Sequence, residues 1–139
     1  MIDIQQLTFR YPRQAVPAIA DLSVQVREGS LFGLLGPNGS GKTTLISILA
    51  GLLPVQGGRV TIGGNALPAE VTRIQRFSSL VPQDDVFYPS LTVAENLAFV
   101  AGVQGIAAGD REGRMQEVLA TTGLERARAR CRRGGCRAA

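Results

Sequence analysis

The segment most suited to chemistry is Gly36–Thr44, which reads Gly-Pro-Asn-Gly-Ser-Gly-Lys-Thr-Thr. Its glycines follow the spacing G-x-x-x-x-G-K-[ST] and permit backbone conformations in which successive N–H groups turn inward around a phosphate. Lys42 adds a compact charge suited to β- and γ-phosphates, and the Thr43 hydroxyl is the expected ligand of a Mg²⁺ that bridges the same oxygens. The candidate phosphate-binding residues are Gly36, Pro37, Asn38, Gly39, Ser40, Gly41, Lys42, Thr43 and Thr44.

Lys42 also stands out by composition. It is the only lysine in the chain, and the other fourteen of the fifteen basic residues are arginines. An ammonium group on a flexible stem fits a tight phosphate site better than a planar guanidinium does. The residue type at position 42 therefore supports the interpretation of the segment as a phosphate loop.

The flanking residues predict the elements that would position this loop. The run 30–35 is apolar on both faces, as in a buried parallel strand, whereas apolar residues repeat at helical intervals after the loop, at Leu45, Ile46, Ile48, Leu49 and Leu52. A helix beginning near Lys42 would add unpaired N–H groups and the positive end of its dipole. The order strand, glycine loop, helix distinguishes the segment from an ordinary turn.

The rest of the chain continues this mixture of strands and helices. Apolar alternation predicts a strand at 2–9 with a bulge near Gln5-Gln6, and a second strand along Ile19, Leu22, Val24 and Val26. Short strands are predicted at 59–62 and 77–81, and a weak helix at 70–76. Thr92 and Glu95 form a capping box before a helix ending at Gly102, and a further helix runs from about Asp110 to a stop at Gly123.

Charge and composition exclude several classes of function. The net charge of +4 arises from six arginines after position 125, while residues 1–125 hold nine basic and eleven acidic residues. Only seven aromatic residues are present, and they are not interleaved with basic ones, so specific nucleic-acid binding is not expected. No apolar run is long enough to span a bilayer and the N-terminus lacks a signal peptide, so we expect a cytoplasmic protein.

The composition changes at about Arg126. Residues 126–139 contain arginine, glycine, cysteine and alanine without a periodic apolar face. The two cysteines, Cys131 and Cys136, cannot close a four-ligand zinc site in a chain that has no histidine. Two interpretations remain open for this tail: a solvated, disordered arginine-rich segment, or, from about Cys131, a frameshift product of a GC-rich gene.

Three motifs in order give the chain a family resemblance: Leu31–Thr44, Val81-Pro-Gln-Asp84 and Leu91-Thr-Val-Ala-Glu-Asn-Leu97. With them, residues 1–125 resemble the ATP-binding domain of ABC transporters, in particular of bacterial exporters. The resemblance implies an α/β P-loop NTPase fold with an N-terminal antiparallel β subdomain and, from residue 92, the start of a helical subdomain. We therefore divide the chain into a partial ATP-binding domain, 1–125, and a tail, 126–139.

The resemblance also implies roles for single residues and the cofactors ATP and Mg²⁺. Tyr11 matches the aromatic residue that stacks on adenine, with Val16 adding an apolar contact, although Tyr11 could instead be an aromatic at a strand end that covers the sheet. Gln83 matches the glutamine that meets Mg²⁺ and the attacking water, in a loop that touches the membrane partner. Gln83 and Lys42 are thus the candidate catalytic residues, and Thr43 and Gln83 the candidate metal ligands.

The chain also departs from the family pattern. It has no Leu-Ser-Gly-Gly signature, no apolar strand ending in Asp-Glu, and no histidine. In the family these residues contact the γ-phosphate on the opposite subunit, hold magnesium and activate water, and general-base assistance alone is typically worth about 10² to 10⁴ in rate. The absent strand would lie beside residues 30–35, so its loss is expected to leave an apolar edge exposed.

The resemblance implies an ATP-binding subunit that couples ATP binding and hydrolysis to export through a separate transmembrane permease. Such a subunit would form a homodimer of ATP-binding domains and sit peripherally on the inner face of the cell membrane, while the permease chooses the cargo. An alternative is a truncated nucleotide-binding protein that binds Mg-ATP without hydrolysing it. A third, a small P-loop kinase, is disfavoured because no acidic residue is placed for it.

Overall fold

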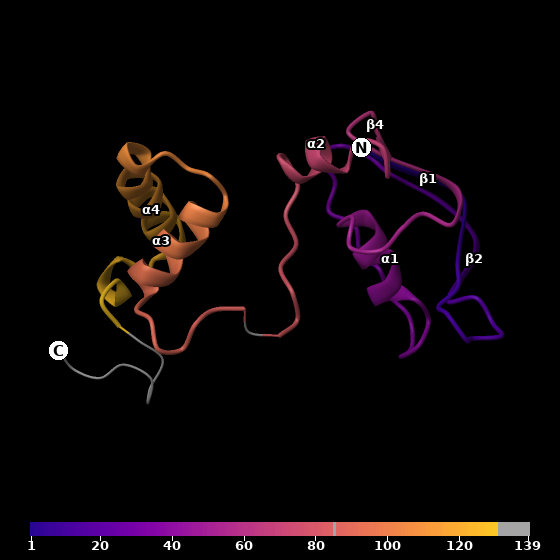
Figure 1. The fold of residues 1–139 in the computed structure, drawn as a ribbon, viewed down its shortest axis with the longest axis horizontal. Coiled ribbons are helices and arrows are strands. Elements are labelled where there is room, and N and C mark those ends of the chain that lie inside the picture. The colour runs from indigo at the N-terminus through magenta and orange to yellow at the C-terminus, as the bar shows by residue number, and fades with distance from the viewer. Residues whose placement is uncertain (85, 131–139) are drawn as a thin grey trace. The chain divides into compact units, whose positions relative to one another are not determined.

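The computed structural model describes residues 1–84 and 86–130 (Figure 1). The chain divides into two compact units, Met1–Val81 and Pro82–Ala139, and each is described separately below. Within the described residues, no helix combines the length and the apolar character needed to cross a membrane.

The first unit is built on a four-stranded antiparallel sheet in the order β2-β1-β3-β4. Its strands are β1 (Ile2–Phe9), β2 (Ile19–Val26), β3 (Gly57–Ile62) and β4 (Asn65–Leu67). Strand β1 is central, because Ile4 pairs with Val24 of β2 on one side and with Val60 of β3 on the other. The antiparallel subdomain expected from the sequence is confirmed, and so are its first three strands.

The bulge predicted in β1 is present. The register with β2 shifts between the pairs Ile4–Val24 and Leu7–Leu22, and Gln6 has a positive φ of 50°. An extra residue at this point reverses the alternation of the strand, so that Leu7 as well as Ile4 turns into the core. Leu7 is fully buried there.

Strands β3 and β4 form a hairpin that the sequence interpretation missed. The two connecting residues, Gly63 and Gly64, both have positive φ, as a two-residue hairpin turn of type I′ requires. Val60 then pairs with Leu67 across the hairpin. The Gly-Gly pair directly after the β-prone run Val60-Thr61-Ile62 is the signal that could have predicted it.

Two helices complete the first unit, α1 (Lys42–Leu49) and α2 (Val71–Gln75), both close to their predicted positions. The Leu45 and Ile48 side chains of α1 and the Ile74 side chain of α2 belong to the same buried cluster as the strands. The strand members of that cluster are Ile4, Leu7, Phe9, Ile19, Val60, Ile62 and Leu67. This packing fixes the start of α1, and hence the end of the glycine loop, on the sheet.

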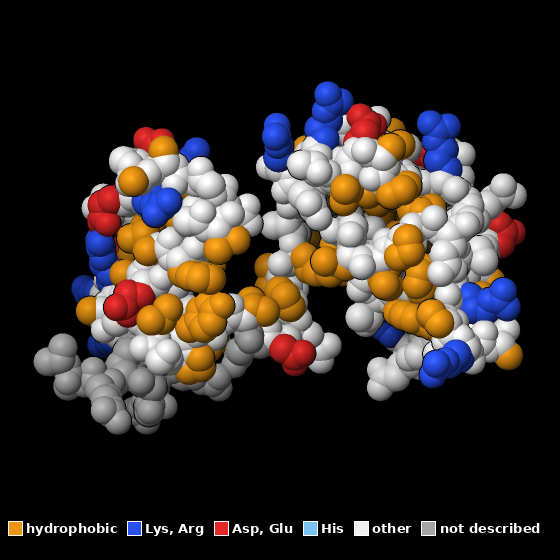
Figure 2. All heavy atoms as spheres, viewed as in Figure 1, with side chains coloured by type: hydrophobic (Ala, Val, Ile, Leu, Met, Phe, Trp, Pro, Cys, Tyr) orange, Lys and Arg blue, Asp and Glu red, His pale blue; other side chains and the backbone are white. Residues whose placement is uncertain are grey.

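The predicted strands at 30–35 and 77–81 are not formed. Neither run has regular secondary structure, and Leu31, Leu35 and Val81 are 103%, 93% and 89% exposed. A strand forms when neighbours pair with its backbone groups, and every strand of the described residues belongs to the antiparallel sheet, which pairs with neither run. Figure 2 shows hydrophobic side chains lying open on the surface of this unit. The strand prediction was therefore wrong for both runs, and so was the predicted burial of 30–35.

The second unit contains α3 (Val93–Val103) and α4 (Ala108–Thr122). The predicted capping box begins α3: the Glu95 N–H donates to Thr92 Oγ1 at 3.2 Å, and the Thr92 N–H donates to Glu95 Oε2 at 2.7 Å. Helix α4 ends at Gly123 in the left-handed conformation, φ 68°, as the sequence predicts.

Part of the arginine-rich segment packs on this unit. After a short 3₁₀ turn at Glu125–Ala127, the carbonyls of Arg128 and Arg130 accept hydrogen bonds of 3.1 Å from the N–H groups of Ala94 and Val93 at the start of α3. The Arg128 guanidinium also pairs with Glu112 at 2.8 Å. Residues 126–130 are therefore held by the helices, while Cys131, Cys136 and the rest of the predicted tail lie outside the described residues.

Candidate phosphate-binding site

The glycine loop adopts the kind of backbone that its spacing predicts. Gly39 and Gly41 are left-handed, with φ of 82° and 85°, and Gly41 immediately precedes α1. The first hydrogen bond of the helix runs from the Leu45 N–H to the Gly41 carbonyl at 2.8 Å. The N–H groups of the preceding turn have no partner within the helix and are those that could bind an anion.

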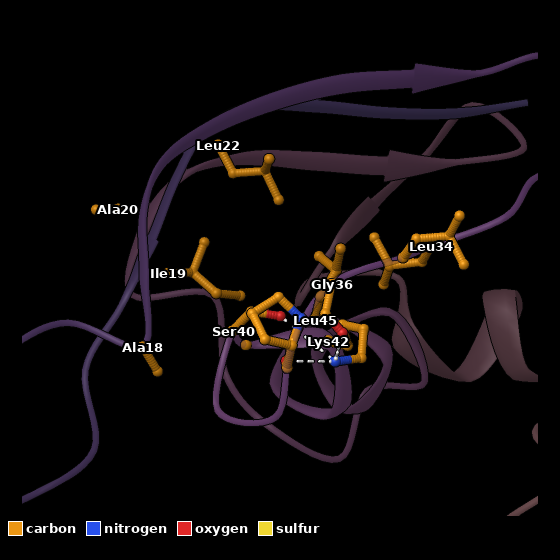
Figure 3. Close-up of a pocket in the computed structure, with 12 residues that line it drawn as sticks. Ala18, Ile19, Ala20, Leu22, Leu34, Gly36, Ser40, Lys42 and Leu45 are labelled. Atoms are coloured by element: carbon orange, nitrogen blue, oxygen red, sulfur yellow. Dashed lines mark hydrogen bonds between the residues drawn. The ribbon is translucent and has the colours of Figure 1, made fainter.

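The Lys42 ammonium group is folded back into this loop. Its Nζ donates to the carbonyl oxygens of Gly36 and Pro37, each at 2.7 Å, and lies 3.4 Å from Ser40 Oγ (Figure 3). Carbonyl oxygens are neutral acceptors, and the charged oxygens of a phosphate would be stronger acceptors for the same ammonium group. The loop thus places its one cation where bound phosphate could replace backbone carbonyls.

A cavity of about 380 Å³ adjoins the loop. Figure 3 shows Ile19 and Leu22 of β2 facing Gly36 and Leu34 across it, with Ser40 and Lys42 at the loop end. Of the described residues that line it, Lys42 alone is charged, and most of the others are apolar. An anion would therefore be stabilised at the loop end alone.

The two threonines at the start of α1 have different environments. Thr43 is exposed, and none of the described residues hydrogen bonds to its hydroxyl in the structure, whereas Thr44 is only 6% exposed and its Oγ1 lies 3.1 Å from the Tyr11 hydroxyl. Mg²⁺ prefers accessible oxygen ligands and keeps several waters. Thr43 fits that requirement, while the Thr44 hydroxyl is turned toward the core.

Tyr11 is held from two sides. Its ring packs edge to face on Phe9, with 5.0 Å between ring centroids, and its hydroxyl reaches Thr44. Tyr11 also packs against the buried cluster of the first unit. These contacts are those of an aromatic residue that covers the end of the sheet; stacking on adenine stays a prediction.

Gln56 takes part in this arrangement, and sequence reasoning missed it. Its side-chain amide accepts from the Arg10 N–H at 2.8 Å and donates to the Arg10 carbonyl at 3.0 Å. The pair fixes the backbone immediately before Tyr11. No sequence pattern marks it, because the two residues are separated by 46 positions.

The remaining predicted site residues lie apart from the loop's hydrogen bonds. Val16 is 73% exposed in the connection between β1 and β2. Asn38 is exposed in the loop, and neither it nor Tyr11 lines the cavity. Gln83 belongs to the second unit, is exposed and has no regular secondary structure. The roles of Val16 and Gln83 therefore stay predictions.

Comparison with known proteins agrees with this geometry. A family model described as ABC transporter matches residues 19–135. The chain belongs to the ABC transporter family. Among its relatives, the linearmycin resistance ATP-binding protein of Bacillus subtilis is 36% identical over 129 residues, and the taurine import ATP-binding protein of Pseudomonas putida is 32% identical over 125 residues.

Solved ABC structures confirm the α/β P-loop fold. A dimeric ATP-binding cassette bound to ADP and Pi superposes with a TM-score of 0.77 and 25% identity, covering 97% of this chain and 62% of the cassette. This chain also spans only 41% of the Bacillus relative and 46% of the Pseudomonas relative. ABC ATP-binding domains generally bind ATP with Mg²⁺.

Proposed function

We propose that the chain is the N-terminal portion of an ABC ATP-binding subunit that couples ATP binding and hydrolysis to export through a separate transmembrane permease. The observation that carries the proposal is the loop itself: Lys42 Nζ lies 2.7 Å from each of two loop carbonyls, and the left-handed Gly41 immediately precedes α1. Residues 1–125 would form the partial ATP-binding domain, and residues 126–139 would be the arginine-rich tail.

In this function the residues of the chain have separate tasks. Lys42 and the N–H groups at the start of α1 would bind the β- and γ-phosphates, Tyr11 and Val16 would contact adenine, and Thr43 would offer its exposed hydroxyl to Mg²⁺. Bound Mg²⁺ would neutralise charge on the phosphate oxygens. Gln83 would hold the attacking water in position.

Export rather than import is supported by the resemblance to bacterial exporters and by the Bacillus relative, which is named for resistance to a compound. Removal of a toxic compound from the cell would produce resistance. The Pseudomonas relative is named as an import protein, so family membership alone does not determine the direction of transport. We propose a homodimer at the inner face of the membrane, as the solved cassette is dimeric.

A second candidate is a nucleotide-binding protein that binds Mg-ATP without hydrolysing it. It is favoured by the lack of a Leu-Ser-Gly-Gly motif, of an apolar strand ending in Asp-Glu and of any histidine in the sequence. Without a general base, a loss of about 10² to 10⁴ in rate is typical.

Phosphate release tests whether this chain hydrolyses ATP by itself. We expect the purified chain to bind Mg-ATP and to release phosphate no faster than its Lys42→Ala variant. Steady release that Lys42→Ala abolishes would show that the chain hydrolyses ATP unaided, and would remove the non-hydrolysing candidate. Failure of the parent chain to bind Mg-ATP would contradict both.

A further inference from the structure

The connection between β1 and β2 supports the phosphate loop at two points. Tyr11, which follows β1, places its hydroxyl 3.1 Å from Thr44 Oγ1 in a part-buried setting. Ala18, which precedes β2, places its carbonyl so close to Gly41 that a Cβ on that glycine would overlap the oxygen. The two contacts lie on either side of Lys42 and Thr43 in the sequence.

Both supports are themselves fixed to the sheet. The Ala18 N–H donates to the Phe9 carbonyl at 2.8 Å, and the Gln56 amide holds the Arg10 backbone through two hydrogen bonds. Phe9 is 2% exposed and packs edge to face on the Tyr11 ring. The position of the Tyr11 hydroxyl is therefore fixed by the surrounding contacts. What the hydroxyl can orient depends on the residue that it contacts.

The partner is the third residue of α1. Successive helix residues are about 100° apart around the axis, so a Thr44 side chain held toward Tyr11 fixes the direction in which Thr43 and the first-turn N–H groups point. Thr44 is buried and Thr43 exposed, as this relationship requires.

We propose that Tyr11 is a positioning residue for phosphate binding: its hydroxyl, through Thr44, holds the first turn of α1 in the orientation that binds the polyphosphate. This inference rests on the proposed function, because it assumes that the loop binds nucleotide. It differs from adenine stacking, since the hydroxyl acts on the phosphate side and would matter even for a ligand that has no base.

Inorganic tripolyphosphate is the probe that separates the two roles. Calorimetric titrations of the full chain with Mg-ATP and with Mg-tripolyphosphate would be compared for the parent and for Tyr11→Phe, which keeps the ring and deletes the hydroxyl. Because Tyr11→Phe deletes one hydrogen bond, it should lower the affinity about three- to tenfold, equally for the two ligands. Tyr11→Leu should weaken ATP further, while matching Tyr11→Phe for tripolyphosphate.

The chain offers a matched control, and the hydrogen bond between Tyr11 and Thr44 can also be removed by changing Thr44. Tyr88 is the only other tyrosine, lies in the second unit and packs on Phe99, so Tyr88→Phe deletes the same atom and should leave both affinities unchanged. Thr44→Val should reproduce the loss seen in Tyr11→Phe, Thr44→Ser should lose less, and Tyr11→Phe combined with Thr44→Val should lose no more than either alone.

The possible outcomes are distinct. Parental affinity of Tyr11→Phe for both ligands, or a loss for ATP alone, would overturn the positioning role and leave the proposed function standing. A lowered unfolding temperature with unchanged affinities would also overturn it, because the bond would then be merely structural. If the parent chain binds ATP but not tripolyphosphate, the positioning role is also overturned, because the loop then contributes no phosphate affinity that Tyr11 could affect. If the parent chain binds neither ligand, the proposed function is overturned as well.

Discussion

The main-chain carbonyl oxygen of Ala18 lies where a Cβ on Gly41 would have to fit, so only glycine has room at this position. Gly41 is also left-handed, with φ of 85°. The residue immediately before α1 is thus constrained both by its own backbone conformation and by the end of the β1–β2 connection. Gly39 shares the first constraint, with φ of 82°, but a Cβ there would meet nothing within 4 Å.

This difference predicts unequal costs for two alanine substitutions in the same loop. Gly39→Ala should lower the free energy of unfolding by about 1–2 kcal/mol, the cost of a left-handed alanine. Gly41→Ala should cost about 1–3 kcal/mol more, because the methyl group also displaces the Ala18 carbonyl. Urea unfolding of the two variants measures both values. Equal costs would show that Gly41 and Ala18 are not in contact.

The exposure of residues 30–35 predicts a second contrast. Ile48 of α1 is fully buried, so Ile48→Ala should lower the free energy of unfolding by about 2–5 kcal/mol. Leu35 is 93% exposed, so Leu35→Ala should change it by no more than about 0.5 kcal/mol. A large cost at Leu35 in the same urea measurements would mean that the run is buried in solution.

Local signals in the sequence account for most of the fold. The phase shift in β1, the capping box at Thr92 and the stop at Gly123 each depend on neighbouring residues, and each was predicted. The runs 30–35 and 77–81 were both predicted as strands, and 30–35 was predicted to be buried because it has no polar face. Burial of a strand, however, depends on strands elsewhere, and none of those described pairs with either run.

The candidate site also combines features set by neighbouring residues, which were predicted, with contacts between distant residues, which were not. Spacing alone predicted the glycine loop, Lys42 and the helix that follows, because these residues are adjacent in the chain. The hydrogen bond between Tyr11 and Thr44 joins residues 33 positions apart, and the hydrogen bonds of the Gln56 amide to the Arg10 backbone join residues 46 positions apart. No pattern in the sequence marks either pair. Gln83 and Val16 were assigned by resemblance, so they still require a direct test.

The capping box of α3 predicts a cost that can be measured in the second unit. Thr92→Ala removes the side-chain acceptor for the Glu95 N–H, and should lower stability by about 1 kcal/mol. Thr121→Ala is the control, because this exposed hydroxyl in α4 donates only to the Glu117 carbonyl of its own helix. The prediction fails if thermal unfolding shows the two variants to be equally stable.

Two carboxylates of the second unit predict an acid-sensitive stability. Hydrogen bonds from the backbone and hydroxyl of Thr92 lower the pKa of Glu95 below its ordinary 4.5, and hydrogen bonds from Arg128 and then Gln116 lower the pKa of Glu112. A carboxylate whose pKa is lower in the folded than in the unfolded state stabilises the folded protein at pH values above its ordinary pKa. This contribution to stability is lost as the pH falls through the lowered pKa.

The unfolding temperature should therefore fall on acidification below the ordinary glutamate pKa of 4.5. Glu95→Gln and Glu112→Gln should each flatten that dependence, and added salt should weaken the Glu112 contribution because the pair with Arg128 is partly exposed. Circular dichroism melts across this pH range measure it. Unchanged acid dependence in both variants would contradict the assigned bonds.

The central claim is that the loop around Lys42 binds the phosphates of ATP, and calorimetric titration of the full chain with Mg-ATP tests it most directly. Lys42→Ala should weaken binding by about tenfold or more, because charge-assisted hydrogen bonds are lost. Arg59→Ala, which removes an equal charge from an exposed residue of β3, should bind as the parent does. Equal affinity of the parent and Lys42→Ala for Mg-ATP would contradict the account.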